Sequence, residues 1–169
     1  MTTLQQVLAA IRSFGDRMPV PVFEMVEMLG IGPEFTPMAD DVSGKIVRTA
    51  APAGYKIVVN AAHHLNRQRF TAAHELGHYI YHRDLLDFGV GDTLAYRAEG
   101  SGFPNPRIGP AQETEANRFA SNLLMPNPLI SALKSQGVRD PADMARRLGV
   151  SEAAMRIKLG VPARTPLFG

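Results

Sequence analysis

The sequence predicts an α+β protein with a small antiparallel sheet, and three observations support this fold class. Two runs rich in β-branched residues, 44–48 (GKIVR) and 55–60 (YKIVVN), are bounded by Gly, Pro and Ala and predict the strands of a hairpin. Apolar residues recur at helical spacing on both sides of this hairpin, so helices outnumber strands. The strands also form one block instead of alternating with helices, which is typical of an α+β domain.

Composition narrows the class of protein further. The chain has 169 residues, of which 45% are hydrophobic, enough for one domain with a small appendage. It contains no cysteine, which excludes disulfide bonds and thiolate zinc sites. We see neither a signal peptide nor an apolar run of about 20 residues, so we expect a cytoplasmic protein without a membrane span. A net charge of +2 and a pI of about 9.2 permit contact with nucleic acid without requiring it.

Two helices are predicted before the hairpin, and we assign them packing roles only. Apolar residues have helical spacing over residues 3–13. Pro19 and Pro21 then break the chain, and residues 22–29 predict a second short helix that ends at Gly30.

Helices also dominate the chain after the hairpin. Asn66 predicts the N-cap of a helix over residues 67–82, whose stripes are apolar enough for burial on two sides. Residues 83–111 are rich in Gly and Pro and are not assigned to an element. A helix over residues 112–125 is predicted to stop at a proline, and two or three short helices follow within 129–159.

The predicted helix over residues 67–82 contains the pattern H-E-x-x-H, formed by His74, Glu75 and His78. Side chains at i and i+4 lie on one helix face about 5–6 Å apart, so both imidazoles can bind one Zn²⁺. Glu75 lies to the side, where it can act as general base without binding the metal. A single buried histidine is more often a packed core residue than a ligand. Two histidines on one buried stripe carry a desolvation cost unless they are hydrogen-bonded or bind a metal.

A catalytic zinc site needs a third protein ligand, and three residues compete for this place. His82 lies about 12 Å from His74 along an unbroken helix, so we expect it to be an outer donor or a helix-end cation. On the next predicted helix, Glu113 lies about 50° from the centre of the apolar stripe and Glu115 about 110° from it. We therefore expect Glu113 to be the third ligand and Glu115 to be a solvated charge. The alternative for Glu113 is a first-turn carboxylate that the helix dipole favours.

Three sequence blocks together resemble the ImmA/IrrE family of metallopeptidases. They are F-T-x-A-H-E-L-G-H at residues 70–78, E-x-x-A-N-x-F-A at 113–120 and L-L-M-P at 123–126. The resemblance implies a zincin-like fold with a minimal thermolysin-like core and a zinc ion held by two His and one Glu. It also implies an intracellular peptidase that cleaves or inactivates helix-turn-helix repressors of mobile-element or stress-response genes. Unlike longer members, this sequence shows no repressor-like domain before the peptidase and no large sensory domain after it.

The chemistry expected at this site is metal-assisted amide hydrolysis, with Glu75 as the base. The oxyanion also needs a donor. The sequence offers several candidates without choosing among them: Tyr79, Tyr81, His82, Arg83, Tyr96 and Arg97. Asn117, one turn after Glu113, could hydrogen-bond a ligand imidazole. Residues 83–111 form either a lid over the site or a plain variable loop.

The C-terminal part resembles a helix-turn-helix. Asp140 and Ser151 are candidate N-caps, and Gly149 lies in the turn. We therefore divide the chain into a metallopeptidase domain, 1–127, and a helical extension, 128–169. The second helix lacks the Asn, Gln or multiple Arg that recognise base edges, so we expect a packing unit or a docking surface for the repressor.

A different class of function stays open at this point. The chain could be a non-proteolytic regulator that binds DNA or protein and keeps a metal site without useful catalysis. The intact Glu75 favours the peptidase, because a purely structural metal site needs no general base.

Overall fold

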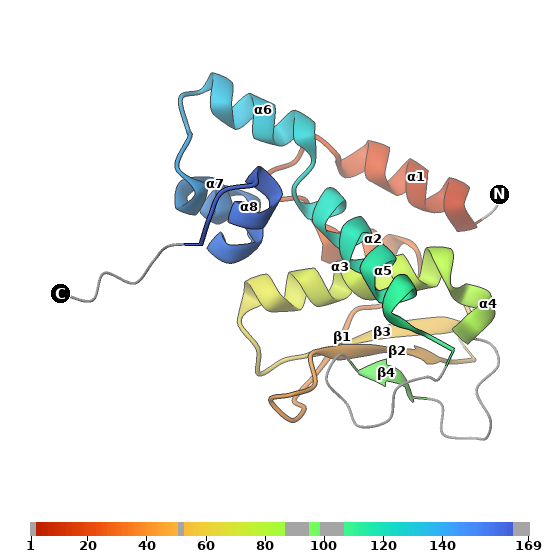
Figure 1. Cartoon of the computed structure of the whole chain (residues 1–169). Helices are drawn as coiled ribbons and strands as arrows, with labels where there is room; N and C mark the ends of the chain where they lie inside the picture. The colour runs from red at the N-terminus through yellow and green to blue at the C-terminus, as the bar shows by residue number, and fades with distance from the viewer. Residues whose placement is uncertain (1–2, 51–52, 87–94, 99–106, 164–169) are drawn as a thin grey trace.

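The structure, a computed structural model, describes residues 3–50, 53–86, 95–98 and 107–163 (Figure 1). The strands are β1 (Glu34–Thr36), β2 (Gly44–Arg48), β3 (Tyr55–Asn60) and β4 (Ala95–Ala98). The helices are α1 (Thr3–Phe14), α2 (Val22–Met28), α3 (Leu65–Tyr81), α4 (Arg83–Leu86), α5 (Pro110–Leu124), α6 (Asn127–Ser135), α7 (Pro141–Leu148) and α8 (Glu152–Leu159). This confirms a mixed α+β fold in which helices outnumber strands.

The sheet is mixed, so the prediction of an antiparallel sheet is only half right. The strand order is β1-β3-β2-β4. β2 and β3 form the predicted antiparallel hairpin, with Gly44 opposite Val59 and Arg48 opposite Tyr55. β1 pairs with the other edge of β3 in parallel. The sequence could not show this, because β1 has only three residues, all of them exposed, and carries no alternating pattern.

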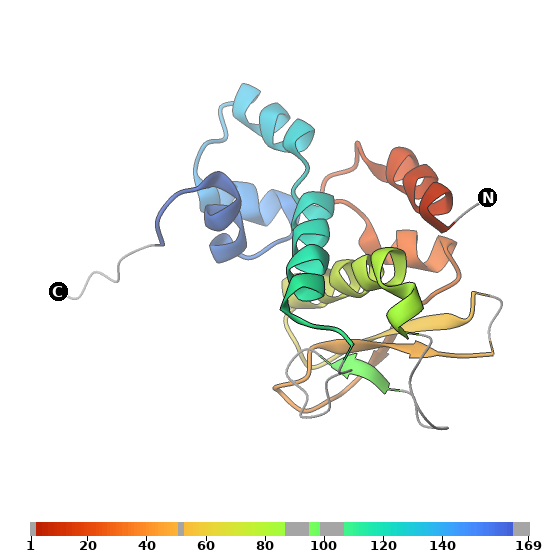
Figure 2. The ribbon, with the colours of Figure 1, turned by 45° about the vertical axis from the view of Figure 1, so that its right-hand side comes forward.

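Helix α3 lies along one face of the sheet, and α5 crosses α3 (Figures 1 and 2). All residues from Thr71 to Tyr79 are buried, which confirms that α3 is covered on two sides. The helix begins at Leu65 and not after Asn66. His64 is the N-cap and accepts a hydrogen bond from the Asn66 backbone N–H, so the prediction of Asn66 as N-cap was wrong. The Asn66 amide instead donates to the Val150 carbonyl over 2.9 Å.

Small residues let α3 and α5 approach closely. A Cβ atom on Gly77 would lie 3.2 Å from the Ala116 Cα atom and 3.2 Å from the Phe119 ring. Ala116 is completely buried at this crossing. Because Glu113 precedes Ala116 by one helical turn, the close approach carries Glu113 towards the histidines of α3.

Within the described residues, three helices follow α5, in line with the two or three predicted, and the proposed caps are confirmed. Asp140 accepts from the Asp143 backbone N–H, and Ser151 accepts from that of Ala154. Gly149 has a left-handed backbone (φ 65°) that ends α7. Among the described residues, no helix is both long enough and apolar enough to cross a membrane.

A buried arginine joins α3 to the C-terminal helices. Arg69 is only 6% exposed, and its guanidinium donates to the carbonyls of Gly149 (3.0 Å) and Val20 (2.8 Å). Burial lowers the pKa of Arg69, so these bonds offset a desolvation cost. The last carbonyls of α7 also carry partial negative charge, which favours a cation there.

Replacing Arg69 with methionine keeps most of the side-chain volume and removes every donor. We expect the free energy of unfolding to fall by about 2–3 kcal/mol, because the buried carbonyls lose their partners. Urea denaturation of the metal-free chain measures this loss. Arg12→Met, at an exposed position of α1, is the matched control and should change the free energy of unfolding by less than about 0.5 kcal/mol. Equal losses for both variants would refute the role given to Arg69.

Candidate metal centre

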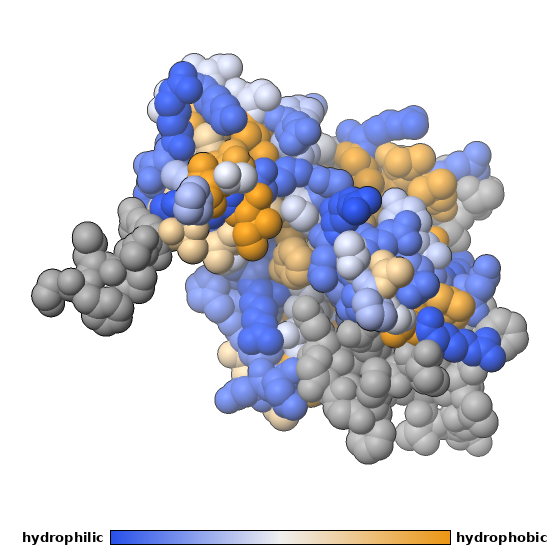
Figure 3. Space-filling view, in the orientation of Figure 1, coloured by the Kyte–Doolittle hydropathy of each residue, from blue (hydrophilic) through white to orange (hydrophobic). Residues whose placement is uncertain are grey.

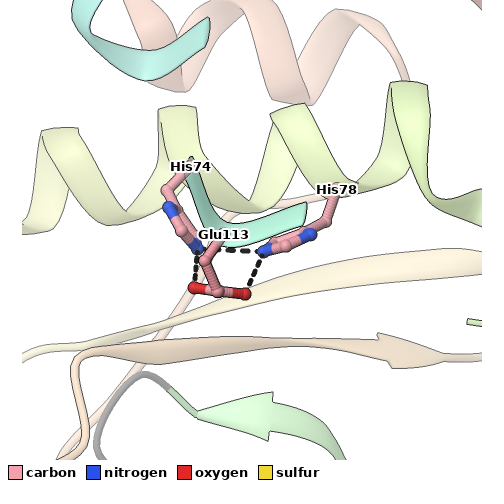
Figure 4. A group of neighbouring side chains, drawn as sticks. All are labelled: His74, His78 and Glu113. Atoms are coloured by element: carbon pink, nitrogen blue, oxygen red, sulfur yellow. Dashed lines mark hydrogen bonds and ion pairs between the residues drawn. The ribbon is translucent and has the colours of Figure 1, made fainter. Parts of the chain in front are cut away.

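The structure brings His74 and His78 of α3 together with Glu113 of α5 (Figure 4). The ligand atoms of these three residues all lie within 4.8 Å of one another. The two Nε2 atoms are 3.0 Å apart, and Glu113 lies 3.1 Å from His78 Nε2 and 3.5 Å from His74 Nε2. Both histidines are at most 2% exposed, whereas the Glu113 side chain is 18% exposed.

This arrangement fits a small divalent cation. Two imidazole nitrogens and a carboxylate form a donor set typical of catalytic zinc sites. Four ligands at about 2.0–2.1 Å in a tetrahedron are separated by roughly 3.3 Å, close to the distances found here. A cation among these atoms would also offset the cost of placing the Glu113 carboxylate in a partly buried position.

A hydrogen bond to Asn117 fixes the orientation of the His74 ring. His74 Nδ1 lies 2.8 Å from the Asn117 side-chain oxygen, which can only accept. The proton of a neutral His74 therefore belongs on Nδ1, and the lone pair on Nε2 points to the cluster. The structure thus confirms the contact between Asn117 and a cluster imidazole that the sequence suggested.

A longer chain of hydrogen bonds orients His78. Its Nδ1 lies 2.9 Å from His82 Nδ1, and His82 Nε2 lies 3.1 Å from Glu115 Oε2. The Glu115 carboxylate can only accept, so His82 carries its proton on Nε2 and accepts at Nδ1 from His78. His78 then presents an unprotonated Nε2 to the cluster. One set of proton positions satisfies the whole chain.

The hydrogen bonds among His78, His82 and Glu115 revise one prediction and support another. Glu115 lies outside the cluster, as its helix face predicts, and its side chain is 56% exposed. The hydrogen bond between Glu115 and the buried His82 is not predicted by the sequence, because it connects segments that are distant in sequence. His82 lies outside the cluster, as the rise of the helix requires. Burial lowers the pKa of His82 and so favours its neutral ring, although the hydrogen bond to Glu115 acts in the opposite direction.

The other predicted site residues are Glu75 and the candidate oxyanion donors. Glu75 is 1% exposed and directly follows His74 in α3. The Tyr81 ring packs edge-on against Phe119 at 5.8 Å, and the Arg83 guanidinium lies over the rings of Tyr55 and Tyr79. None of these packing contacts identifies an oxyanion donor among the described residues. Tyr96 and Arg97 belong to β4, but their side chains lie outside the described part of the structure, as does most of segment 83–111.

Comparison with known proteins identifies the family. Residues 34–160 match a peptidase family model described as the IrrE N-terminal-like domain. The chain is 32% identical over 115 residues to the radiation response metalloprotease IrrE of Deinococcus radiodurans, covering 66% of this chain and 33% of that protein. A solved Mycobacterium tuberculosis transcriptional regulator has the same fold, with a TM-score of 0.59 and 22% identity, over 98% of this chain and 49% of that one. The chain thus spans a third to a half of these proteins, and it belongs to the ImmA/IrrE family of metallopeptidases.

Proposed function

We propose that the chain is a zinc-dependent metallopeptidase in which His74, His78 and Glu113 hold the metal. The observation that carries this proposal is the convergence of two buried imidazoles and one carboxylate within 4.8 Å. Membership of a metallopeptidase family implies a metal ion, and these three residues could bind one. Two imidazoles with a carboxylate suit Zn²⁺ better than Mg²⁺ or Ca²⁺, which prefer oxygen ligands only.

Glu75 is the proposed general base. Bound Zn²⁺ would polarise the scissile carbonyl and lower the pKa of the attacking water. Glu75 takes the proton of that water and then delivers it to the leaving amine. Its position beside His74 in a rigid buried helix holds the carboxylate in place for both transfers.

The proposed substrate is a protein, in particular a helix-turn-helix repressor. The resemblance to the ImmA/IrrE family motivates this choice, and one matched relative is named a radiation response metalloprotease. Cleavage of a repressor would derepress mobile-element or stress-response genes in the cytoplasm, the compartment expected from the sequence. The division into domains at residue 127 and the zincin-like character of the first domain belong to the same proposal.

The decisive experiment uses a repressor encoded beside this chain. The zinc-loaded chain is incubated with that repressor, and the products are followed by gel electrophoresis and mass spectrometry. We expect one or a few cuts that a chelator abolishes and added Zn²⁺ restores. An intact repressor under all three conditions would contradict the proposed substrate.

The rival proposal, a DNA-binding regulator, receives less support from α7 and α8. Arg156 on α8 bonds Glu152 at 2.8 Å, and Lys158 bonds Asn122 of α5 at 2.7 Å. Both cations are thus engaged within the protein, which weakens the case for phosphate contacts. We therefore propose that this helix-turn-helix-like pair supports the peptidase domain instead of recognising a DNA sequence.

His82 provides a prediction about metal affinity. Replacing it with phenylalanine removes the acceptor of the His78 Nδ1 proton, so His78 loses its fixed tautomer. We expect zinc affinity to fall roughly 10–100-fold, as for other outer partners of ligand histidines. Competition with a chromogenic chelator measures the affinity. His82→Gln retains an acceptor and should recover part of it, whereas an unchanged zinc affinity in the phenylalanine variant would remove His82 from the site.

A further inference from the structure

A groove of about 650 Å³ lies between the N-terminal half of α3 and α8. Its apolar wall includes Phe70, Val150, Ala154 and Ile157. Ile157 is 81% exposed, more than any other large hydrophobic residue in the described part of the chain. Hydrophobic side chains gather over α8 on the face that Figure 3 shows. An exposed apolar wall of this kind is typical of a surface that binds another chain.

The groove begins one turn of α3 away from the candidate metal centre, because Phe70 lines it. Phe70 precedes His74 by one turn of α3, and the centroids of the two rings are 6.5 Å apart. The neighbouring strands run in nearly the same direction as α3 beneath the cluster (Figures 1 and 4). An extended polypeptide bound at the cluster and aligned with α3 would pass Phe70 and reach the groove.

The rim of the groove is positively charged. Arg67 lines it and is exposed, and its Nε donates to the Ser43 hydroxyl over 3.0 Å. Among the described residues, no carboxylate lies within 4 Å of the Arg67 guanidinium, and the lining contains no Asp or Glu. His64 lies on the same rim. A segment that presents an acidic side chain would complement this charge.

We propose that this groove binds the part of the protein substrate beside the scissile bond, and that it selects an apolar residue followed by an acidic one. This inference rests on the proposed peptidase function. The cluster lies roughly 6–9 Å from Phe70 and roughly 10–13 Å from Arg67 along the axis of α3. An extended chain advances about 3.3 Å per residue, so the apolar residue lies two or three positions from the cut and the acidic residue three or four.

The first test determines cleavage preferences. The zinc-loaded chain is incubated with a defined mixture of synthetic peptides, and mass spectrometry locates every cut. We expect an apolar residue and an Asp or Glu to be enriched at these positions on one side of the cut. Arg67→Glu should replace the acidic preference by a Lys or Arg preference, and Ile157→Ser should weaken the apolar one. Arg12→Glu makes the same charge reversal on the distant helix α1 and should leave the profile unchanged.

The second test needs no turnover. A fluorescein-labelled peptide with Leu-Glu at its centre, and a matched peptide with Leu-Lys, are titrated against the zinc-loaded Glu75→Gln chain at low salt. We expect the acidic peptide to bind about fivefold more tightly, and Arg67→Glu to reverse the order.

The two tests separate the possible failures. Cleavage without these preferences, or preferences that Arg67→Glu leaves unchanged, would overturn the groove and leave the peptidase standing. The expected binding preference without any cleavage would overturn the peptidase and keep the groove. Dimerisation that Ile157→Ser abolishes, together with equal binding of both peptides, would show that a second copy of the chain occupies the groove.

Discussion

Replacing Glu75 with glutamine is expected to leave zinc bound and to lower the rate of peptide hydrolysis by roughly 10³-fold. Glutamine has nearly the same shape as glutamate, so the fold and the neighbouring imidazoles keep their positions. Its amide cannot accept the proton of the attacking water, however, and cannot return a proton to the leaving amine. The loss should therefore appear in kcat, while KM changes little.

The measurement combines elemental analysis for zinc with single-turnover cleavage of the peptide or repressor substrate. Glu27→Gln, at an exposed position of α2, makes the same chemical change outside the site and should retain full activity. Full cleavage by the Glu75→Gln chain would remove Glu75 as general base. Loss of zinc together with activity would instead assign Glu75 to the metal site.

Periodic local patterns explain how much of the site the sequence could predict. Positions i and i+4 of one helix must share a face, so the spacing of His74 and His78 is enough to pair them. The apolar stripe of α5 fixed the direction of Glu113 by the same kind of argument. The structure confirms both placements, because each depends on one helix whose limits were predicted to within two residues.

Features that depend on contacts between distant segments could not be predicted in this way. The bond between Glu115 and His82 joins two helices, and neither helical pattern alone reveals it. The parallel pairing of β1 also escaped, because three exposed residues carry no periodic signal. Asn66 has the residue type of a good N-cap, but its bond to Val150 shows that a tertiary contact can override local preference.

Glu113→Ala should remove most of the bound zinc, whereas Glu115→Ala should retain it. Glu113 approaches both Nε2 atoms within 3.5 Å, so its loss leaves only two protein ligands for a cation in a largely buried place. We expect zinc affinity to fall by more than about 100-fold, beyond the upper range for outer partners. Equilibrium competition with a chelator measures the affinity of both variants, and circular dichroism checks that each is folded.

The contrast between the two glutamates tests the geometry directly, because they lie two residues apart on the same helix. Glu115 is 56% exposed, so water can replace its carboxylate as acceptor for His82 Nε2–H, and the tautomer of His78 survives with a smaller loss of affinity. If Glu115→Ala lost as much zinc as Glu113→Ala, His78 would depend on the hydrogen-bond chain as strongly as on the third ligand. If Glu113→Ala kept its zinc while Glu115→Ala lost it, α5 would have to be rotated by about two residues, and the proposed metal centre would be wrong.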